Sequence, residues 1–225
     1  MNKSCFLLFL LLFTGVILSA QETAENYFDR LSENYGTVKD YQGEIIITRG
    51  DVVQTANIFY KSPNLLRLDF TDEDSEGIVL NTDGETLLLH LPEHSVTFTQ
   101  TLARHSSSTI ASMAGSQGLH LLKDNYRIGY KTGPGLEALE EGSEEMVVKL
   151  RLEWLSSSEG FRELEIAVGE NQLIRRITAT STKYEIIQFD FLNLLVNEDI
   201  PNTRFYYESP PVGNDIQNFL FEPEE

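Results

Sequence analysis

The sequence predicts an α+β protein built on a curled antiparallel sheet of about ten or eleven strands, with helices over one face. Three observations lead to this prediction. Residues 22–38 place apolar side chains at helical spacing, short runs rich in β-branched and aromatic residues follow from residue 41, and the links between them are short. Sequential hairpins form an antiparallel sheet, and a sheet of so many strands must curl or close. A curled sheet has a concave face that can hold helices or a ligand.

The first twenty residues, MNKSCFLLFLLLFTGVILSA, are predicted to be a secretory signal peptide. Lys3 precedes an apolar run over residues 6–18, and small residues ending in Ala20 follow. A transmembrane helix needs about 20 apolar residues, and this run is shorter. A retained anchor is the alternative, because Leu18 is a less usual third residue before a cleavage site. We expect cleavage after Ala20 and a single exported, soluble domain over residues 21–225.

The composition disfavours several classes of protein. The chain has 35 Asp and Glu against 17 Lys and Arg, a formal net charge of −18. Such a surface repels phosphate backbones and anionic lipid headgroups, so nucleic-acid binding and charge-driven membrane association are disfavoured. The one cysteine, Cys5, lies in the predicted signal peptide. Cleavage would leave no thiol for a disulfide, a nucleophile or a thiolate metal site.

The first predicted helix spans residues 22–38 and ends near Gly36. Its apolar positions recur at spacings of three and four and are Ala24, Tyr27, Phe28, Leu31 and Tyr35. The pattern is that of an amphipathic helix with one face against a core.

The first group of predicted strands comprises residues 41–50, 51–61, 64–70, a hairpin over 76–91, and 94–101. Arg49-Gly50-Asp51 and Thr82-Asp83-Gly84 are the clearest turn signals. The first triplet also spells a cell-adhesion motif, but Gly-Asp turn chemistry is the commoner use of these residues. The stretch 77–92 is apolar at almost every position, unlike a strand with one wet face. Either both of its faces are covered, or its inner side lines an apolar cavity.

Residues 102–123 interrupt the strands with a poor, broken helix. Leu102, Ile110, Met113 and Leu121 lie near helical spacing, but serines and glycines weaken the pattern. Residues 132–145 are an acidic loop or helical insert. Further strands are predicted over 144–156, 161–169, 172–182, 183–196 and 204–210.

Three stretches resemble the LolA family, the periplasmic carriers of outer-membrane lipoproteins. They are the Lys-Ser-Pro-Asn-Leu strand opening at 61–65, the Thr-Asp-Gly hairpin at 82–84, and the closing stretch that reaches Phe-Tyr-Tyr at 205–207 before two prolines. With the order helix, strands, helices, strands, the resemblance covers most of residues 22–212. It implies an antiparallel half-barrel with N-terminal and central lid helices over an apolar cavity. Ser62 stands where the family has a lid-locking arginine, and the nearest arginine is Arg67, so no lid-locking residue is assigned.

The resemblance implies that apolar strand residues line a cavity for acyl chains, while ordinary core packing is the alternative for each of them. The predicted lining is Leu66, Leu68, Phe70, Leu87, Leu89, Val96, Phe98, Leu150, Leu152, Trp154 and Ile186. The predicted lid residues are Leu102, Ile110 and Met113.

The resemblance implies a monomeric, cofactor-free carrier of acylated lipoproteins. Its implied partners are an inner-membrane release complex and an outer-membrane acceptor. A carrier or sensor of a free lipid or small amphiphile on the same scaffold is the first alternative. The tail after Pro211 has no assigned role; its apolar residues would contact a sheet edge or a partner.

A third hypothesis is a hydrolase that uses His105 or the pair His90 and His94. That pair has the four-residue spacing of metal ligands on a helix, but Pro92 between them favours a turn. His105 precedes three serines without a Gly-x-Ser-x-Gly elbow. We therefore predict no enzyme activity and no metal site.

Overall fold

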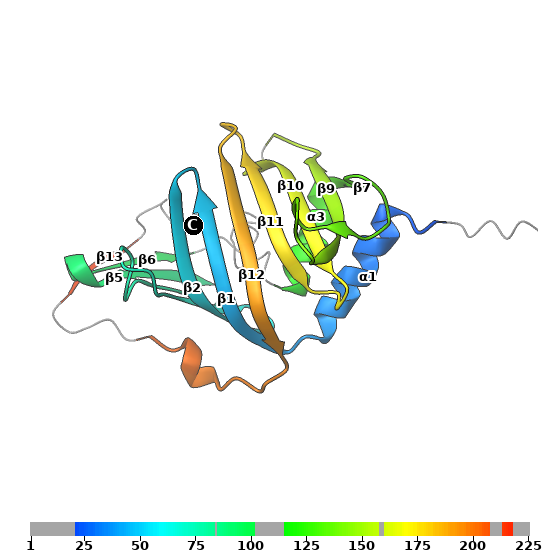
Figure 1. Ribbon diagram of the computed structural model, residues 1–225. Coiled ribbons are helices and arrows are strands. Elements are labelled where there is room, and N and C mark those ends of the chain that lie inside the picture. The colour runs from blue at the N-terminus through cyan, green and yellow to red at the C-terminus, as the bar shows by residue number, and fades with distance from the viewer. Residues whose placement is uncertain (1–20, 84, 102–114, 158–159, 208–212, 218–225) are drawn as a thin grey trace, which may run out of the picture.

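The computed structural model of the chain describes residues 21–83, 85–101, 115–157, 160–207 and 213–217 (Figure 1). In this part of the chain, two helices accompany a 13-stranded sheet that curls without closing. The α+β class with a curled, mostly antiparallel sheet is therefore confirmed. The predicted signal peptide lies outside the described residues.

The two described helices are α1 (Ala24–Thr37) and α3 (Ser116–Asn125). α1 begins after Thr23, whose hydroxyl accepts a hydrogen bond from the Asn26 N–H at 3.2 Å, and it buries the predicted apolar face. α3 matches the end of the predicted central helix. The predicted lid residues Leu102, Ile110 and Met113 lie outside the described residues.

The first half of the sheet follows the predicted hairpins. Its elements are β1 (Asp40–Arg49), β2 (Val52–Lys61), β3 (Leu65–Phe70), β4 (Val79–Thr82), β5 (Thr86–Leu91), the short 3₁₀ helix η1 (Pro92–His94) and β6 (Val96–Thr101). Gly50 has φ 59°, so the Arg-Gly-Asp triplet forms the β1–β2 turn as its turn chemistry predicts.

The second half contains three strands that the sequence did not predict, namely β7, β8 and β13. Its elements are β7 (Tyr126–Tyr130), β8 (Glu137–Ala138), β9 (Met146–Trp154), β10 (Phe161–Gly169), β11 (Ile174–Ser181), β12 (Ile186–Val196), the 3₁₀ helix η2 (Asn202–Phe205) and β13 (Asn214–Gln217). The strand predicted over 204–210 is wrong where the structure describes it. Residues 202–205 form η2, and the carbonyls of Arg204 and Phe205 bond to side chains instead of a strand ladder.

The strands run in the order β13-β6-β5-β4-β3-β2-β1-β12-β11-β10-β9-β7, with β8 paired to β9. Neighbours pair antiparallel except β13, which adds to β6 in parallel. β1 and β12, from opposite ends of the chain, pair at the centre of this order.

One face of the sheet, here called the inner face, holds the core. Ile45 of β1 is opposite Phe191 of β12 and Ala56 of β2, and all three side chains are buried. α1 and α3 contact each other and β7, so they lie at the β7 end of the sheet (Figure 1). Phe28 and Leu31 of α1 are fully buried in this core.

The opposite, outer face of β2–β5 is covered by residues 200–207, here called the C-terminal strap. Arg67 Nη1 donates to the Arg204 carbonyl at 3.1 Å, and Asn81 Nδ2 donates to the Phe205 carbonyl at 2.8 Å. Phe205 is buried, as are Val79 and His90 on the outer face beneath. The outer face of β4 and β5 therefore has cover, which explains why an apolar residue such as Val79 stands where a strand with one wet face would have a polar one.

Candidate functional site

The inner face of β3–β6 is an uncharged surface. Its register places Leu68 opposite Leu80, Leu80 opposite Leu89, and Leu89 opposite Phe98. The remaining inner positions of these four strands are Leu66, Phe70, Thr82, Leu87, Leu91, Val96 and Gln100. A surface of this composition can bury hydrocarbon by excluding water.

The apolar side chains on this face become less buried from β3 toward β5 and β6, whereas the polar Thr82 and Gln100 are buried. Leu66, Leu68 and Phe70 of β3 are buried, whereas Leu87 and Leu89 of β5 are half-buried. Leu80, Val96 and Phe98 are also half-buried. The β5–β6 part therefore has apolar area that is not fully used in packing.

The structure brings ten of the eleven predicted lining residues onto the inner face. Leu150 and Leu152 of β9 are fully buried on it, opposite Ile166 and Leu164 of β10. Trp154 follows them at the end of β9 and is half-buried. These three residues lie at the β7 end, near the described helices and away from β3–β6.

Ile186 does not share the inner face. It is opposite Thr180 on the outer side and is 58% exposed, whereas Ile187 takes the inner position opposite Ala179. Two adjacent isoleucines at a strand start leave the face ambiguous, and a shift of one residue exchanges the two sides.

Tyr41 of β1 and Tyr60 of β2 form a stacked pair on the inner face. The rings of Tyr41 and Tyr60 stack at 5.0 Å between centroids, and burial raises the pKa of both hydroxyls. Tyr60 donates to the Pro63 carbonyl at 3.2 Å. Gly115 packs so closely on Tyr60 that a Cβ there would overlap the hydroxyl. The start of α3 is thereby held against β2.

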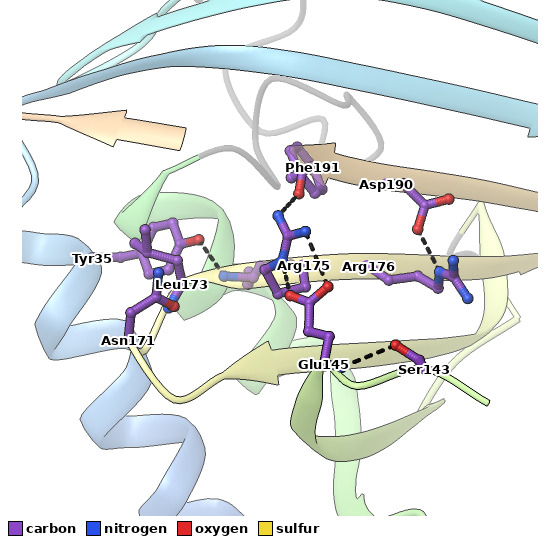
Figure 2. A network of polar contacts seen from close by, with 10 residues as sticks. Tyr35, Ser143, Glu145, Asn171, Leu173, Arg175, Arg176, Asp190 and Phe191 are labelled. Atoms are coloured by element: carbon purple, nitrogen blue, oxygen red, sulfur yellow. Dashed lines mark hydrogen bonds and ion pairs between the residues drawn. The ribbon is translucent and has the colours of Figure 1, made fainter. Parts of the chain in front are cut away.

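A polar network at the start of β11 joins α1, β11, β12 and Glu145, which directly precedes β9, and it was not predicted from the sequence (Figure 2). Arg175 binds both carboxylate oxygens of Glu145 and donates from Nη1 to the Phe191 carbonyl. Arg176 pairs with Asp190, and the Tyr35 hydroxyl accepts from the Ile174 N–H at 2.9 Å. A polar cleft of about 530 Å³ lies beside Glu145 and Arg175. These charges pair with one another. The hydrogen bonds of the network connect α1 and β12 to β11.

The predicted pair His90 and His94, and the strand residue Arg67, do not lie on the inner face. His90 is buried on the outer face, with Nδ1 3.0 Å from the Thr97 hydroxyl, and His94 is exposed in η1. Across the described residues, no three His, Cys, Asp or Glu side chains gather as metal ligands. Arg67 faces the C-terminal strap and pairs with Asp69 at 2.7 Å. His105 lies outside the described residues.

Comparisons with known proteins find similarity in three-dimensional structure. No protein-family model and no curated protein matches the sequence. An uncharacterized conserved protein from Thermus thermophilus superposes with a TM-score of 0.56 at 12% identity, covering 86% of this chain and 98% of that one. The complex of MucA and MucB from Pseudomonas aeruginosa gives a TM-score of 0.50 at 15% identity, covering 82% of this chain and 61% of that one.

A LolA superfamily protein from Nitrosomonas europaea is also among the similar structures, with a TM-score of 0.44, 12% identity, and coverage of 83% of this chain and 98% of that one. The family whose motifs the sequence resembles is thus represented among the similar structures. At these identities the shared property is the fold. None of the described helices is long and apolar enough to cross a membrane.

Proposed function

We propose that this protein is a periplasmic carrier that binds the acyl chains of lipoproteins on the inner face and moves them toward the outer membrane. The observation that supports this proposal is the uncharged, half-buried inner face of β5 and β6 beside the buried core of β3. The sequence resemblance to LolA-type carriers supplies the cargo class, and the predicted signal peptide supplies the compartment.

The energetics of such a carrier require no catalytic group. Each buried methylene contributes about 0.8 kcal/mol, so one acyl chain supplies a large driving force for uptake. Release requires that this binding stay reversible. Side chains that are half-buried, such as Leu87 and Leu89, gain less from a guest than fully exposed ones, which keeps the complex from becoming too stable.

The proposed carrier acts between two membranes. We propose an inner-membrane complex that loads it and an outer-membrane acceptor that unloads it, as the family resemblance implies. The chain would act as a monomer without a cofactor, because burial of hydrocarbon needs neither a second subunit nor a prosthetic group.

The matched pair Leu89→Gln and Leu88→Gln tests the proposed site. Leu89 is on the inner face opposite Phe98, whereas Leu88 is on the outer face opposite Asn81. We expect Leu89→Gln to weaken binding of a diacylated lipopeptide by about tenfold, because it places an amide against hydrocarbon. Leu88→Gln should leave the dissociation constant within about twofold. Binding is measured by titration calorimetry with the lipopeptide, because the single tryptophan, Trp154, lies at the β7 end away from this site.

Mass spectrometry of organic extracts from natively purified protein identifies the cargo. A copurifying acylated lipoprotein supports the proposal, whereas a stoichiometric free lipid would assign the scaffold to free lipids instead. Equal losses in both leucine variants, or no uptake by the unmodified protein, would contradict an acyl-binding inner face.

A further inference from the structure

Three hairpin turns lie together at one end of the strands, and this end of the sheet is here called the hairpin edge. They are the β1–β2 turn with Val52 and Val53, the β11–β12 turn over 182–186, and the β9–β10 turn that begins at Leu155. Arg49 is opposite both Val52 and Ile187, and Ser181 is opposite Phe161, so the three turns are neighbours. The tips of the β1–β2 and β11–β12 hairpins project side by side beyond the sheet (Figure 1).

The hairpin edge concentrates exposed apolar side chains. Among the large hydrophobic residues that the structure describes, five of the six most exposed belong to this edge. They are Tyr184 at 71%, Val52 at 60%, Leu155 at 60%, Ile186 at 58% and Val53 at 56%. Single exposed apolar residues are ordinary, but a gathering of this kind marks an interaction surface.

Tyr184 is held outward at the tip of its hairpin. Its φ of 65° is a left-handed conformation that suits Gly or Asn and strains a bulky residue. Arg162 of β10 lies 4.1 Å from the centre of its ring and 5.9 Å from the ring of Trp154. A tyrosine ring, with an apolar body and a polar hydroxyl, is a side chain enriched at membrane–water interfaces.

The charges of the hairpin edge differ from those of the chain. Arg49 pairs with Glu185 at 2.9 Å, and Arg162, Lys183 and Asp51 are the other charged residues of the hairpin edge among those that the structure describes. The sequence adds Glu159 between β9 and β10, so three basic residues stand against three acidic ones, although the chain has a net charge of −18. The acidic β3–β4 turn at 72–76, beyond β2, bounds the edge on one side.

We propose that the hairpin edge docks this protein on the surface of a lipid bilayer, with the five apolar side chains inserted among the headgroups. Projecting convex tips suit a deformable bilayer, whereas a folded protein partner would need a matching cleft. The inner face reaches this edge through Ile47 and Ile187, so the docked protein presents hydrocarbon-binding surface next to the bilayer. Docking depends on the exposed edge alone and stands whether or not the proposed cargo is correct.

The test is flotation of the mature chain with phosphatidylcholine vesicles. The double variant Tyr184→Asn with Ile186→Ser removes two inserted side chains, and Asn suits the left-handed position. Leu195→Ser is the matched control, because Leu195 is 54% exposed at the other end of β12. We expect the double variant to lower the vesicle partition coefficient at least about tenfold and the control to stay within about twofold.

Three results would overturn the inference. They are no flotation of the unmodified chain, an equal effect of Leu195→Ser, and binding that appears only when half of the lipid is phosphatidylglycerol. The third result would indicate adsorption by charge, which a nearly balanced edge does not predict. Thermal unfolding shows whether each variant is folded. Lipopeptide uptake in solution, which the double variant leaves intact, separates this inference from the proposed cargo site.

Discussion

Tyr35 connects α1 to the sheet through a single hydroxyl. The ring is buried, and its oxygen accepts the Ile174 N–H at 2.9 Å, so this strand-end amide has a partner inside the core. Helical spacing predicted that Tyr35 faces the core. A hydrogen bond to a residue 139 positions away depends on how the sheet folds back, and no local pattern in the sequence encodes it.

We predict that the buried tyrosines make the protein labile in alkali. Burial raises the pKa of Tyr35, Tyr41 and Tyr60, whereas an unfolded tyrosine titrates near pH 10. The unfolded chain then releases protons that the folded chain retains. The free energy of unfolding is therefore unaffected by these groups below about pH 10 and falls above it by about 1.4 kcal/mol per pH unit per tyrosine.

Tyr35→Phe separates the two roles of this hydroxyl. We expect a loss of about 1–3 kcal/mol at neutral pH, because the Ile174 N–H loses its acceptor, and a shallower alkaline slope by one proton. Urea unfolding from neutral to alkaline pH measures both effects. An unchanged slope would show that Tyr35 ionises as readily in the folded protein as in the unfolded chain.

At the scale of the element, β12 is shaped by an irregularity opposite β1. The pairing of the two strands shifts between Gln42 and Glu44, and Asn193 adopts φ 53°. A Cβ on Gly43 would come within 2.6 Å of the Leu192 carbonyl oxygen. Gly43 is thus the residue that lets the two strands stay paired across the irregularity.

We predict that Gly43→Ala destabilises the protein by about 1–3 kcal/mol, because the added methyl group meets backbone atoms that have no free space. Gly135→Ala is the control, since nothing lies within 4 Å of the corresponding Cβ. Urea denaturation of both variants gives the comparison. A loss in Gly135→Ala as large as that in Gly43→Ala would point to a general effect of glycine replacement.

Elements with a clear local pattern in the sequence were predicted, whereas very short elements and those shaped by distant contacts were not. The spacing of Tyr27, Phe28 and Leu31 predicted α1, and Gly50 predicted the β1–β2 turn. β8 and β13 have two and four residues, too few for a period to show. The aromatic run at 204–207 looks like a strand, but here its backbone bonds to Arg67 and Asn81 across the outer face.

Over the whole molecule, the C-terminal strap supplies outer-face cover that the sheet lacks by itself. Lys61 Nζ donates to the Ile200 carbonyl at 2.5 Å, and Arg67 and Asn81 donate to the carbonyls of Arg204 and Phe205 further along the strap. These donors come from β2, β3 and β4 in turn. The strap therefore ties three adjacent strands together.

We predict that Arg67→Met loosens the strap without unfolding the sheet. The change removes the bond to the Arg204 carbonyl and leaves Asp69 without its cation. Amide hydrogen exchange at Arg204 and Tyr206 should accelerate about tenfold, as expected for a local loss of about 1.4 kcal/mol. Arg127→Met, at an exposed position of β7, should leave these amides unchanged. Acceleration spread over the core strands would instead indicate global destabilisation.

The architecture was predictable because hairpin signals and strand count determine the class of sheet. Ten of the eleven side chains named from the sequence share the inner face, and their role in binding stays a prediction. What the sequence leaves open is which residues stay half-buried. Leu66 and Leu87 are both leucines in similar apolar runs. Leu66 is buried and Leu87 is half-buried, and this difference in burial depends on how the strands pack in three dimensions.

The pairing of β1 with β12 bears on how the chain is made. Strands β1–β6 and β7–β11 emerge from the ribosome first, but they join only when residues 186–196 supply β12 between β1 and β11. A chain that stops earlier has two part-sheets with open edges and uncovered apolar faces, which invite proteolysis and aggregation. A chain that ends before residue 186 therefore cannot close this seam, because the strand that joins its two part-sheets is missing.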